Sequence, residues 1–93
     1  MRKTVTECLK AGSYAVEIIN DIVANGAASQ YANEGESQAY ITDRVQRNVN
    51  HLVLMLKYDG TGSWKPNIAS ENTSLKTTHI AAVTAGTKYI KDN

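Results

Sequence analysis

The stretch ITDRVQRNVNHLVLMLKY, residues 41–58, carries the pattern that decides the fold. Apolar residues recur in it at intervals of three and four, which is the spacing of one face of an α-helix. The stretch therefore predicts a helix over residues 37–57 with one buried face and with Met55 at the edge of that face. The residues expected on the buried face are Ile41, Val45, Asn48 or Val49, Leu52 and Leu56.

The C-terminal half of this stretch has more apolar residues than one buried face requires. If Leu52 and Leu56 point to the core, Leu54 points almost the opposite way, and Val53 adds to it, so this end is apolar nearly all round. A helix with that character is usually buried on more than one side. Three interpretations remain open: cover by the loop that follows, cover by another protein chain, or a single exposed leucine without a partner.

A second helix is predicted over residues 4–25, where apolar residues again recur at helical spacing. Thr4 and Glu7 have the form of a capping box, in which each side chain accepts a hydrogen bond from the backbone amide of the other. Asn25-Gly26 is a natural stop, because glycine adopts left-handed backbone geometry at little cost.

A third helix is predicted over residues 74–91, with Thr73 or Ser74 as its cap. Ala82 and Gly86 lie four residues apart on its apolar face, so another helix could approach closely there.

Residues 58–73 are rich in turn formers and hold the only proline, which predicts a loop of unusual length. No segment shows the alternation of a half-buried strand. The predicted fold is therefore all-α, a single domain over residues 1–93 built from three helices.

Size and charge narrow the function classes. The formal net charge of +1 gives no strong field to attract nucleic acid or an anionic membrane. No apolar run approaches the length of a membrane span, and the N-terminal stretch lacks the apolar core of a signal peptide.

A chain of 93 residues has a small core, and one cysteine allows no internal disulfide. Oligomerisation or docking into a larger assembly is therefore expected to support the fold.

Residues with catalytic or metal-binding chemistry are scattered along the chain. Cys8 falls on an apolar helix face, where a small buried hydrophobe is favoured over a nucleophile. His79 lies centrally on the apolar face of the third helix, where a hydrogen-bonded core-edge histidine is favoured over a ligand or base. Glu34 and Glu36 stand in a connector with no partner histidine or acid in view. Because no nucleophile, base and orienting group come together, we predict no enzyme, no catalytic residue, no metal site, no cofactor and no small-molecule substrate.

One flank of the central helix gathers Tyr40, Arg44, Arg47 and His51. One interpretation is a basic strip that contacts phosphate or an acidic partner. The other is a solvated flank whose arginine stems cover the edge of the core, which the nearby Asp43 and the low net charge favour. A helix that reads DNA normally belongs to a far more basic domain, so nucleic acid is not the expected partner.

Trp64 stands in the long loop beside Lys65-Pro66. A tryptophan in a loop is a typical anchor of a protein interface. It could equally be a lid that covers Leu54, and the sequence leaves both interpretations open.

Two runs of sequence, DRVQRNVNHLVLML (residues 43–56) and THIAAVTAGTKYI (residues 78–90), carry a family resemblance. They resemble small uncharacterised proteins encoded by tailed bacteriophages, particularly marine ones. Those proteins tend to show an R-N-V-x-H-L-x-x-M-L run followed by an A-x-x-A-G-x-x-Y-I end. The likeness covers about residues 41–90 and does not include the first helix. It implies no defined activity, but it does imply a virion-associated or host-interaction role.

The sequence therefore predicts a small non-enzymatic protein that binds other protein chains, as a homo-oligomer or within a larger viral assembly. In its most concrete form it is a phage structural protein, present in multiple copies on a capsid, neck or tail. It would reside in the virion or the host cytoplasm, without membrane contact. The alternative is a small nucleic-acid-binding or regulatory helical module. The residues predicted to contact the partner are Tyr40, Arg44, Arg47, Val53, Leu54, Tyr58 and Trp64.

Overall fold

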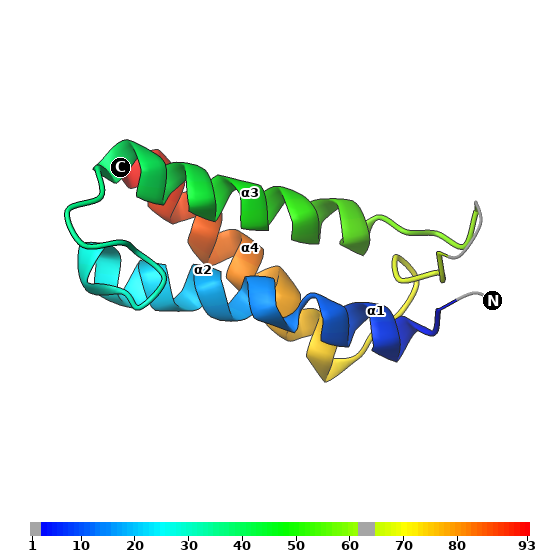
Figure 1. Cartoon of the computed structure of the whole chain (residues 1–93). Coiled ribbons are helices and arrows are strands. Elements are labelled where there is room, and N and C mark those ends of the chain that lie inside the picture. The colour runs from blue at the N-terminus through cyan, green and yellow to red at the C-terminus, as the bar shows by residue number, and fades with distance from the viewer. Residues whose placement is uncertain (1–2, 62–64) are drawn as a thin grey trace.

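The computed structural model describes residues 3–61 and 65–93, which form an all-α domain (Figure 1). A bent rod of two short helices lies beside a long helix, and the last helix runs obliquely behind both (Figure 1). Within the described ranges the only β-pairing is one isolated bridge, between Asp59 and Asn67. The prediction of an all-α domain of three helices is confirmed, with the first helix bent. The elements are α1 (Val5–Ala11), α2 (Ser13–Asn25), η1 (Gly26–Ala28, a 3-10 turn), α3 (Gln38–Leu56) and α4 (Ser74–Asp92).

The helices begin and end close to the residues that the sequence indicates. The amide of Thr4 donates to Glu7 Oε1 (3.0 Å) and the amide of Glu7 donates to Thr4 Oγ1 (3.1 Å), so the predicted capping box is present. Gly26 ends α2 as predicted, with φ of 55° and ψ of −129°, a positive-φ conformation that favours glycine but differs from the left-handed helical geometry expected there. Thr73 caps α4 by accepting from the amide of Lys76 (3.2 Å).

The first rod is broken at Gly12, where the sequence predicts one continuous helix over residues 4–25. A Cβ atom at this position would lie 2.8 Å from Met55 Cε and 3.0 Å from His79 Nε2. The break therefore coincides with the point where side chains of α3 and α4 press against the backbone of the rod. Glycine leaves room for this contact, because it places no side chain between the rod and the His79 ring.

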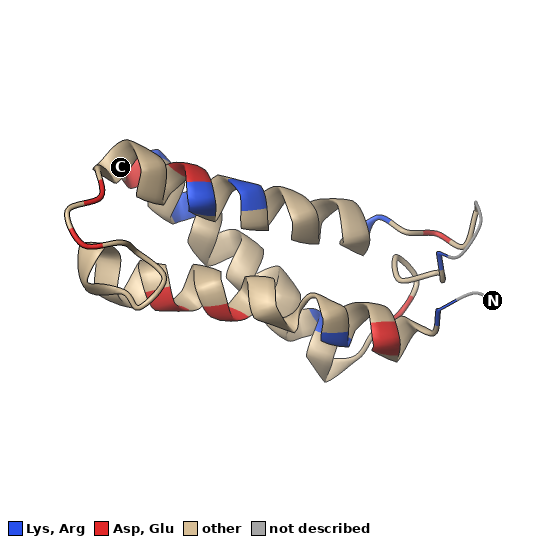
Figure 2. Ribbon diagram, in the orientation of Figure 1, with Lys and Arg blue, Asp and Glu red and all other residues tan. Residues whose placement is uncertain are grey.

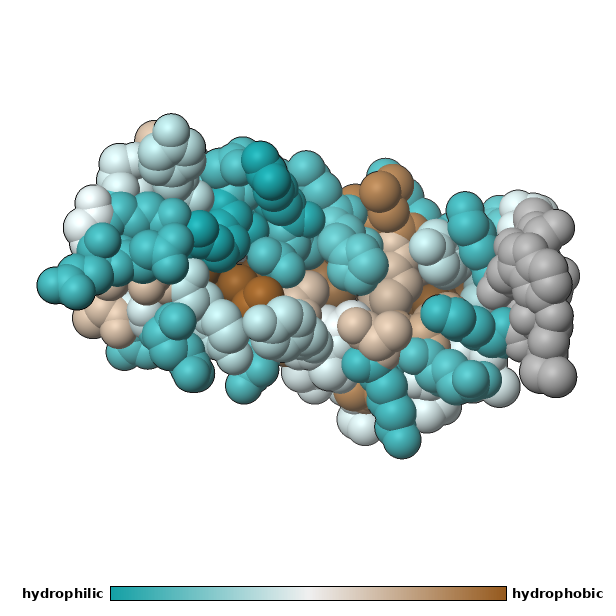
Figure 3. Space-filling view, in the orientation of Figure 1, coloured by the Kyte–Doolittle hydropathy of each residue, from teal (hydrophilic) through white to brown (hydrophobic). Residues whose placement is uncertain are grey.

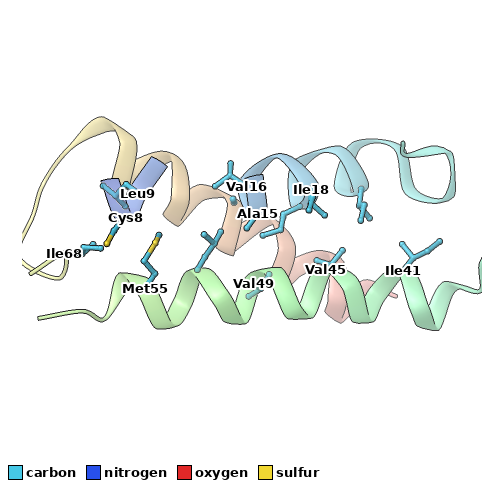
Figure 4. Packing of buried hydrophobic residues seen from close by; sticks show 14 residues of the cluster. Cys8, Leu9, Ala15, Val16, Ile18, Ile41, Val45, Val49, Met55 and Ile68 are labelled. Carbon is cyan, nitrogen blue, oxygen red and sulfur yellow. The ribbon is translucent and has the colours of Figure 1, made fainter. Parts of the chain in front are cut away.

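The core fills the space between the rod, α3 and α4 (Figure 4). Along α3 it uses the predicted face, because Ile41, Val45, Val49 and Leu52 are buried. The edge of that face differs from the prediction: Met55 is buried, whereas Leu56 is only half-buried.

The helix α4 packs closely at Gly86, as the sequence predicts. A Cβ atom on Gly86 would lie 2.6 Å from Val49 Cγ2 on α3 and 3.0 Å from Ile19 Cγ2 on α2. Both of these neighbours are buried, so the missing side chain is what lets the backbone of α4 reach both helices.

The described part of the loop between α3 and α4 folds back onto the core. Ile68 is fully buried, and its amide and that of Ala69 both donate to the carbonyl oxygen of Tyr58 at 2.8 Å. The loop prediction is confirmed, but this loop also contributes a core residue, which the sequence analysis did not predict.

Candidate protein-binding surface

The outward face of α3 carries most of the residues predicted to contact a partner. We call this face the outer strip of α3 and define it by the exposed residues Tyr40, Asp43, Arg47, Asn50, His51 and Leu54. Tyr40 is 69% exposed and Leu54 is 64% exposed. Figure 3 shows apolar atoms standing out from the surface above the C-terminal part of α3. At about 1.5 Å of rise per residue, Tyr40 and Leu54 lie about 21 Å apart along the helix.

The neighbours Val53 and Leu54 differ in their surroundings. Val53 is half-buried and packs against the core, so its apolar surface is largely used within the chain. Leu54 remains exposed, and the described residues of the loop do not cover it. The sequence leaves two possible covers for Leu54, the following loop and another protein chain. The described part of the loop does not cover it.

Tyr58 lies at the end of α3 between two hollows in the surface. The ammonium group of Lys65 lies 5.0 Å from the centre of the Tyr58 ring, in cation–π geometry. Tyr58 and Lys65 together line a groove of about 320 Å³ between α1 and α3, whose walls include Cys8, Met55 and His51. The same pair also lines a hollow beside Leu54. Tyr58 thus connects the outer strip to the groove.

The predicted contact residue Arg44 is engaged within the chain. Its guanidinium donates to both carboxylate oxygens of Glu36, at 2.6 and 2.7 Å, and to the carbonyl oxygen of Tyr31 at 3.0 Å. The hydrogen bonds from Arg44 lower the pKa of Glu36 from 4.5 to about 2. Sequence reasoning missed this pair, because it saw no partner for Glu36. In the structure, Arg44 fastens the connector between α2 and α3 to the helix.

The connector is also fastened to α2. Ser29 is buried and its hydroxyl donates to Asp21 Oδ1 at 2.5 Å, which lowers the pKa of Asp21. The ring of Tyr31 packs edge-on against Tyr14, and hydrogen bonding to the carboxylate of Glu17 raises the pKa of Tyr31 to about 12. The connector is therefore an ordered polar cover at this end of the molecule.

The N-terminal half of α3 carries one acidic residue, Asp43, and two basic residues, Arg44 and Arg47 (Figure 2). Arg47 pairs with Asp43 on the next turn, with 2.8 Å between Nε and Oδ2, and both side chains are well exposed. An exposed pair of this kind contributes little to stability, about 0.5 kcal/mol or less. It does, however, neutralise much of the basic character that the sequence offers at Arg47.

Cys8 and His79, two of the residues considered for catalysis, are both buried. Cys8 is a free thiol on the apolar face of α1, as predicted. The ring nitrogens of His79 each lie 2.7 Å from a carbonyl oxygen, Nδ1 from that of Leu75 and Nε2 from that of Leu9. The predicted hydrogen-bonded histidine is confirmed, and it ties α4 to the rod close to the break at Gly12.

Neither a metal centre nor a helix that could cross a membrane occurs among the residues that the structure describes. No cluster of three His, Cys, Asp or Glu side chains is placed to hold an ion, and no helix is long and apolar enough to cross a membrane. Trp64, predicted as an anchor or a lid, lies outside the described residues.

Comparison of this chain with known protein families, with curated proteins and with solved structures gives no match.

Proposed function

We propose that this chain is a non-enzymatic protein that binds other protein chains through the C-terminal part of α3. In its most concrete form it is a structural component of a phage particle, present in multiple copies on a capsid, neck or tail. The observation that supports the proposal is Leu54, which is 64% exposed on a helix whose other large apolar residues in that region pack inward. Tyr58 and Lys65 line both the mainly apolar groove between α1 and α3 and the more polar hollow beside Leu54.

Burial of this surface in a protein contact would contribute a free energy that is substantial beside the stability of a small domain. Complete burial of a leucine side chain is worth about 1.5–3 kcal/mol, so covering what remains exposed of Leu54 would contribute about 1–2 kcal/mol. A domain of this size is stable by only about 5–10 kcal/mol, so a few such contacts matter. In this proposal Arg47 supplies a polar group beside the apolar contact at Leu54, and Arg44 supports the surface by holding the connector.

The alternative is a nucleic-acid-binding or regulatory module that would use Arg44, Arg47 and His51. The charges around the two arginines weaken this alternative, because Glu36 pairs with Arg44 and Asp43 pairs with Arg47. A phosphate-binding surface loses affinity steeply with added salt, whereas an apolar contact does not. Salt dependence therefore separates the two functions.

The test is self-association, measured by light scattering over a concentration series for the wild-type chain and for Leu54→Asp. Val23→Asp is the matched control, because Val23 is also an exposed apolar residue but lies near the C-terminal end of α2. We expect the wild type and the control to associate, and Leu54→Asp to remain monomeric with unchanged helix content. We also expect association to persist at about 0.5 M salt, where the screening length is about 4–5 Å. A monomeric wild type that binds DNA at low salt would overturn the proposal.

A further inference from the structure

Two pairs of residues on the outer strip of α3 lie at equal distances on either side of Arg47: Tyr40 with Leu54, and Asp43 with His51. Tyr40, Arg47 and Leu54 are spaced by seven, which is close to two helical turns, so they lie in one line. Arg47 is at the centre of this line, with a large exposed apolar residue at each end. Asp43 lies four residues before the centre and His51 lies four residues after it.

We propose that this strip packs against the same strip of a second copy of the chain, with the two α3 helices antiparallel and a two-fold axis at Arg47. This inference rests on the proposed function and names its partner. A two-fold interface is self-complementary: if one residue contacts another across the axis, the reverse contact also forms. In this arrangement Tyr40 packs on Leu54 of the second copy, and Asp43 faces His51 of the second copy.

Charge complementarity selects the antiparallel direction. A parallel pair would place Asp43 against Asp43 and His51 against His51, so that like groups would face each other. The antiparallel pair instead lets the carboxylate of Asp43 accept a hydrogen bond from the imidazole of His51 in the second copy. The two Arg47 side chains meet near the axis, but each arrives with its own carboxylate, because Arg47 Nε lies 2.8 Å from Asp43 Oδ2.

The exposed surface is also suited to this contact. Tyr40 and Leu54 are the two most exposed large apolar side chains in the described part of the chain. The antiparallel pair covers both of them in both copies, using contacts between neighbouring ridges of two helices. The strip contains both of the exposed large apolar side chains of α3, since the other large ones on this helix are buried or half-buried.

The size of the strip sets the strength of the pair. With about 21 Å between its ends, the strip covers less than the roughly 800 Å² per partner of a standard stable interface. The dimer therefore dissociates on dilution. It forms where the copies are held close together, because tethering on a common surface raises their effective concentration. A component repeated over the surface of a particle meets this condition.

Cysteine cross-linking tests both the pairing and its direction. Cys8→Ala removes the native thiol from the full-length chain, and single cysteines are then placed on the strip in that background. A short bismaleimide joins thiols only when they lie close together. We expect Arg47→Cys to cross-link with itself, because it lies on the axis. Tyr40→Cys and Leu54→Cys should not cross-link alone but should form a mixed dimer when the two chains are combined. Thr84→Cys, on the exposed face of α4, gives the background from random collisions.

Each outcome decides the question. The expected pattern, with cross-linking that rises with concentration, supports the antiparallel pair. Self-cross-linking of Tyr40→Cys or Leu54→Cys at the rate of the mixed sample indicates a parallel or unspecific contact and overturns the inference. Cross-linking of Arg47→Cys no faster than Thr84→Cys also overturns it. If the wild type associates and Leu54→Asp abolishes association, but the expected cross-linking pattern is not seen, only the antiparallel pair is overturned. If the wild type does not associate at all, the proposed function is overturned together with the antiparallel pair.

Discussion

Replacing Gly86 by alanine should destabilise the protein, although alanine is the better helix former. Gly86 lies inside α4, where its backbone meets α2 and α3. The added Cβ would lie 2.6 Å from Val49 Cγ2 and 3.0 Å from Ile19 Cγ2, both well inside normal contact distance. A valine in a helix is stiff about χ1, so Val49 cannot rotate away without strain.

Two opposing terms decide the size of the effect. Exchanging glycine for alanine in a helix gains about 1 kcal/mol from helix propensity. Forcing an extra carbon into a packed core costs about 1–3 kcal/mol, and the two short contacts at Gly86 place this change at the upper end. The expected net loss is therefore about 1–2 kcal/mol in the free energy of unfolding. For a domain of this length that corresponds to a fall of about 5–10 °C in Tm.

The assay is thermal unfolding followed by circular dichroism, with two companion variants. Ala81→Gly, at an exposed position of the same helix, should lose about 1 kcal/mol from propensity alone. Adding Val49→Ala to Gly86→Ala removes the shorter of the two contacts, so in that background the alanine at position 86 should destabilise less. A Gly86→Ala variant with a higher Tm than the wild type would refute the packing argument, because propensity would then have outweighed the contacts.

Two further predictions concern the polar contacts. His79→Leu should lower the free energy of unfolding by about 1–3 kcal/mol in urea titrations, because it removes the buried imidazole whose ring nitrogens lie 2.7 Å from the carbonyl oxygens of Leu9 and Leu75; an unchanged midpoint would show that these contacts are not needed. Glu36 has a folded pKa of about 2 against a usual 4.5, so its pairing stabilises the fold above pH 4.5 and this contribution is lost as the pH falls toward 2. The Tm of Glu36→Gln should therefore fall less than that of the wild type between pH 5 and about 2, and parallel curves would contradict the role of its bond to Arg44.

Helix positions could be predicted from the sequence, because they depend on local patterns. The spacing of apolar residues located all three helical segments, and the Thr4–Glu7 pair marked the first N-terminus. The close approach at Gly86 was also predictable, because small residues four apart on an apolar face have few other purposes. These signals are all contained within one helix, so no knowledge of the rest of the chain is needed.

Features that depend on distant segments were missed. The break at Gly12 accommodates the ring of His79, which is far away in the sequence. Ile68 is a single apolar residue in a polar loop, and its burial follows from how the loop folds back to Tyr58. The pair of Arg44 with Glu36 depends on the path of the connector, which has no periodic pattern.

The candidate surface was only partly predictable. The sequence placed Leu54 opposite the core, but whether the loop would cover it required the structure, which leaves it exposed. Val53 and Arg44 were predicted to lie on the same surface, and the structure also gives each of them contacts within the chain. Side-chain direction can be read from helical spacing, whereas the cover over a side chain depends on the whole fold.

The most direct test of a protein contact on α3 is the comparison of amide chemical shifts at micromolar and millimolar concentrations. If α3 meets another chain through its outer strip, the amides of Tyr40, Arg47 and Leu54 should shift together as the concentration rises. The amides around Val23 and Thr84, which lie elsewhere on the surface, should stay unchanged. Identical spectra at both concentrations, or shifts scattered over all helices, would contradict a contact on this face.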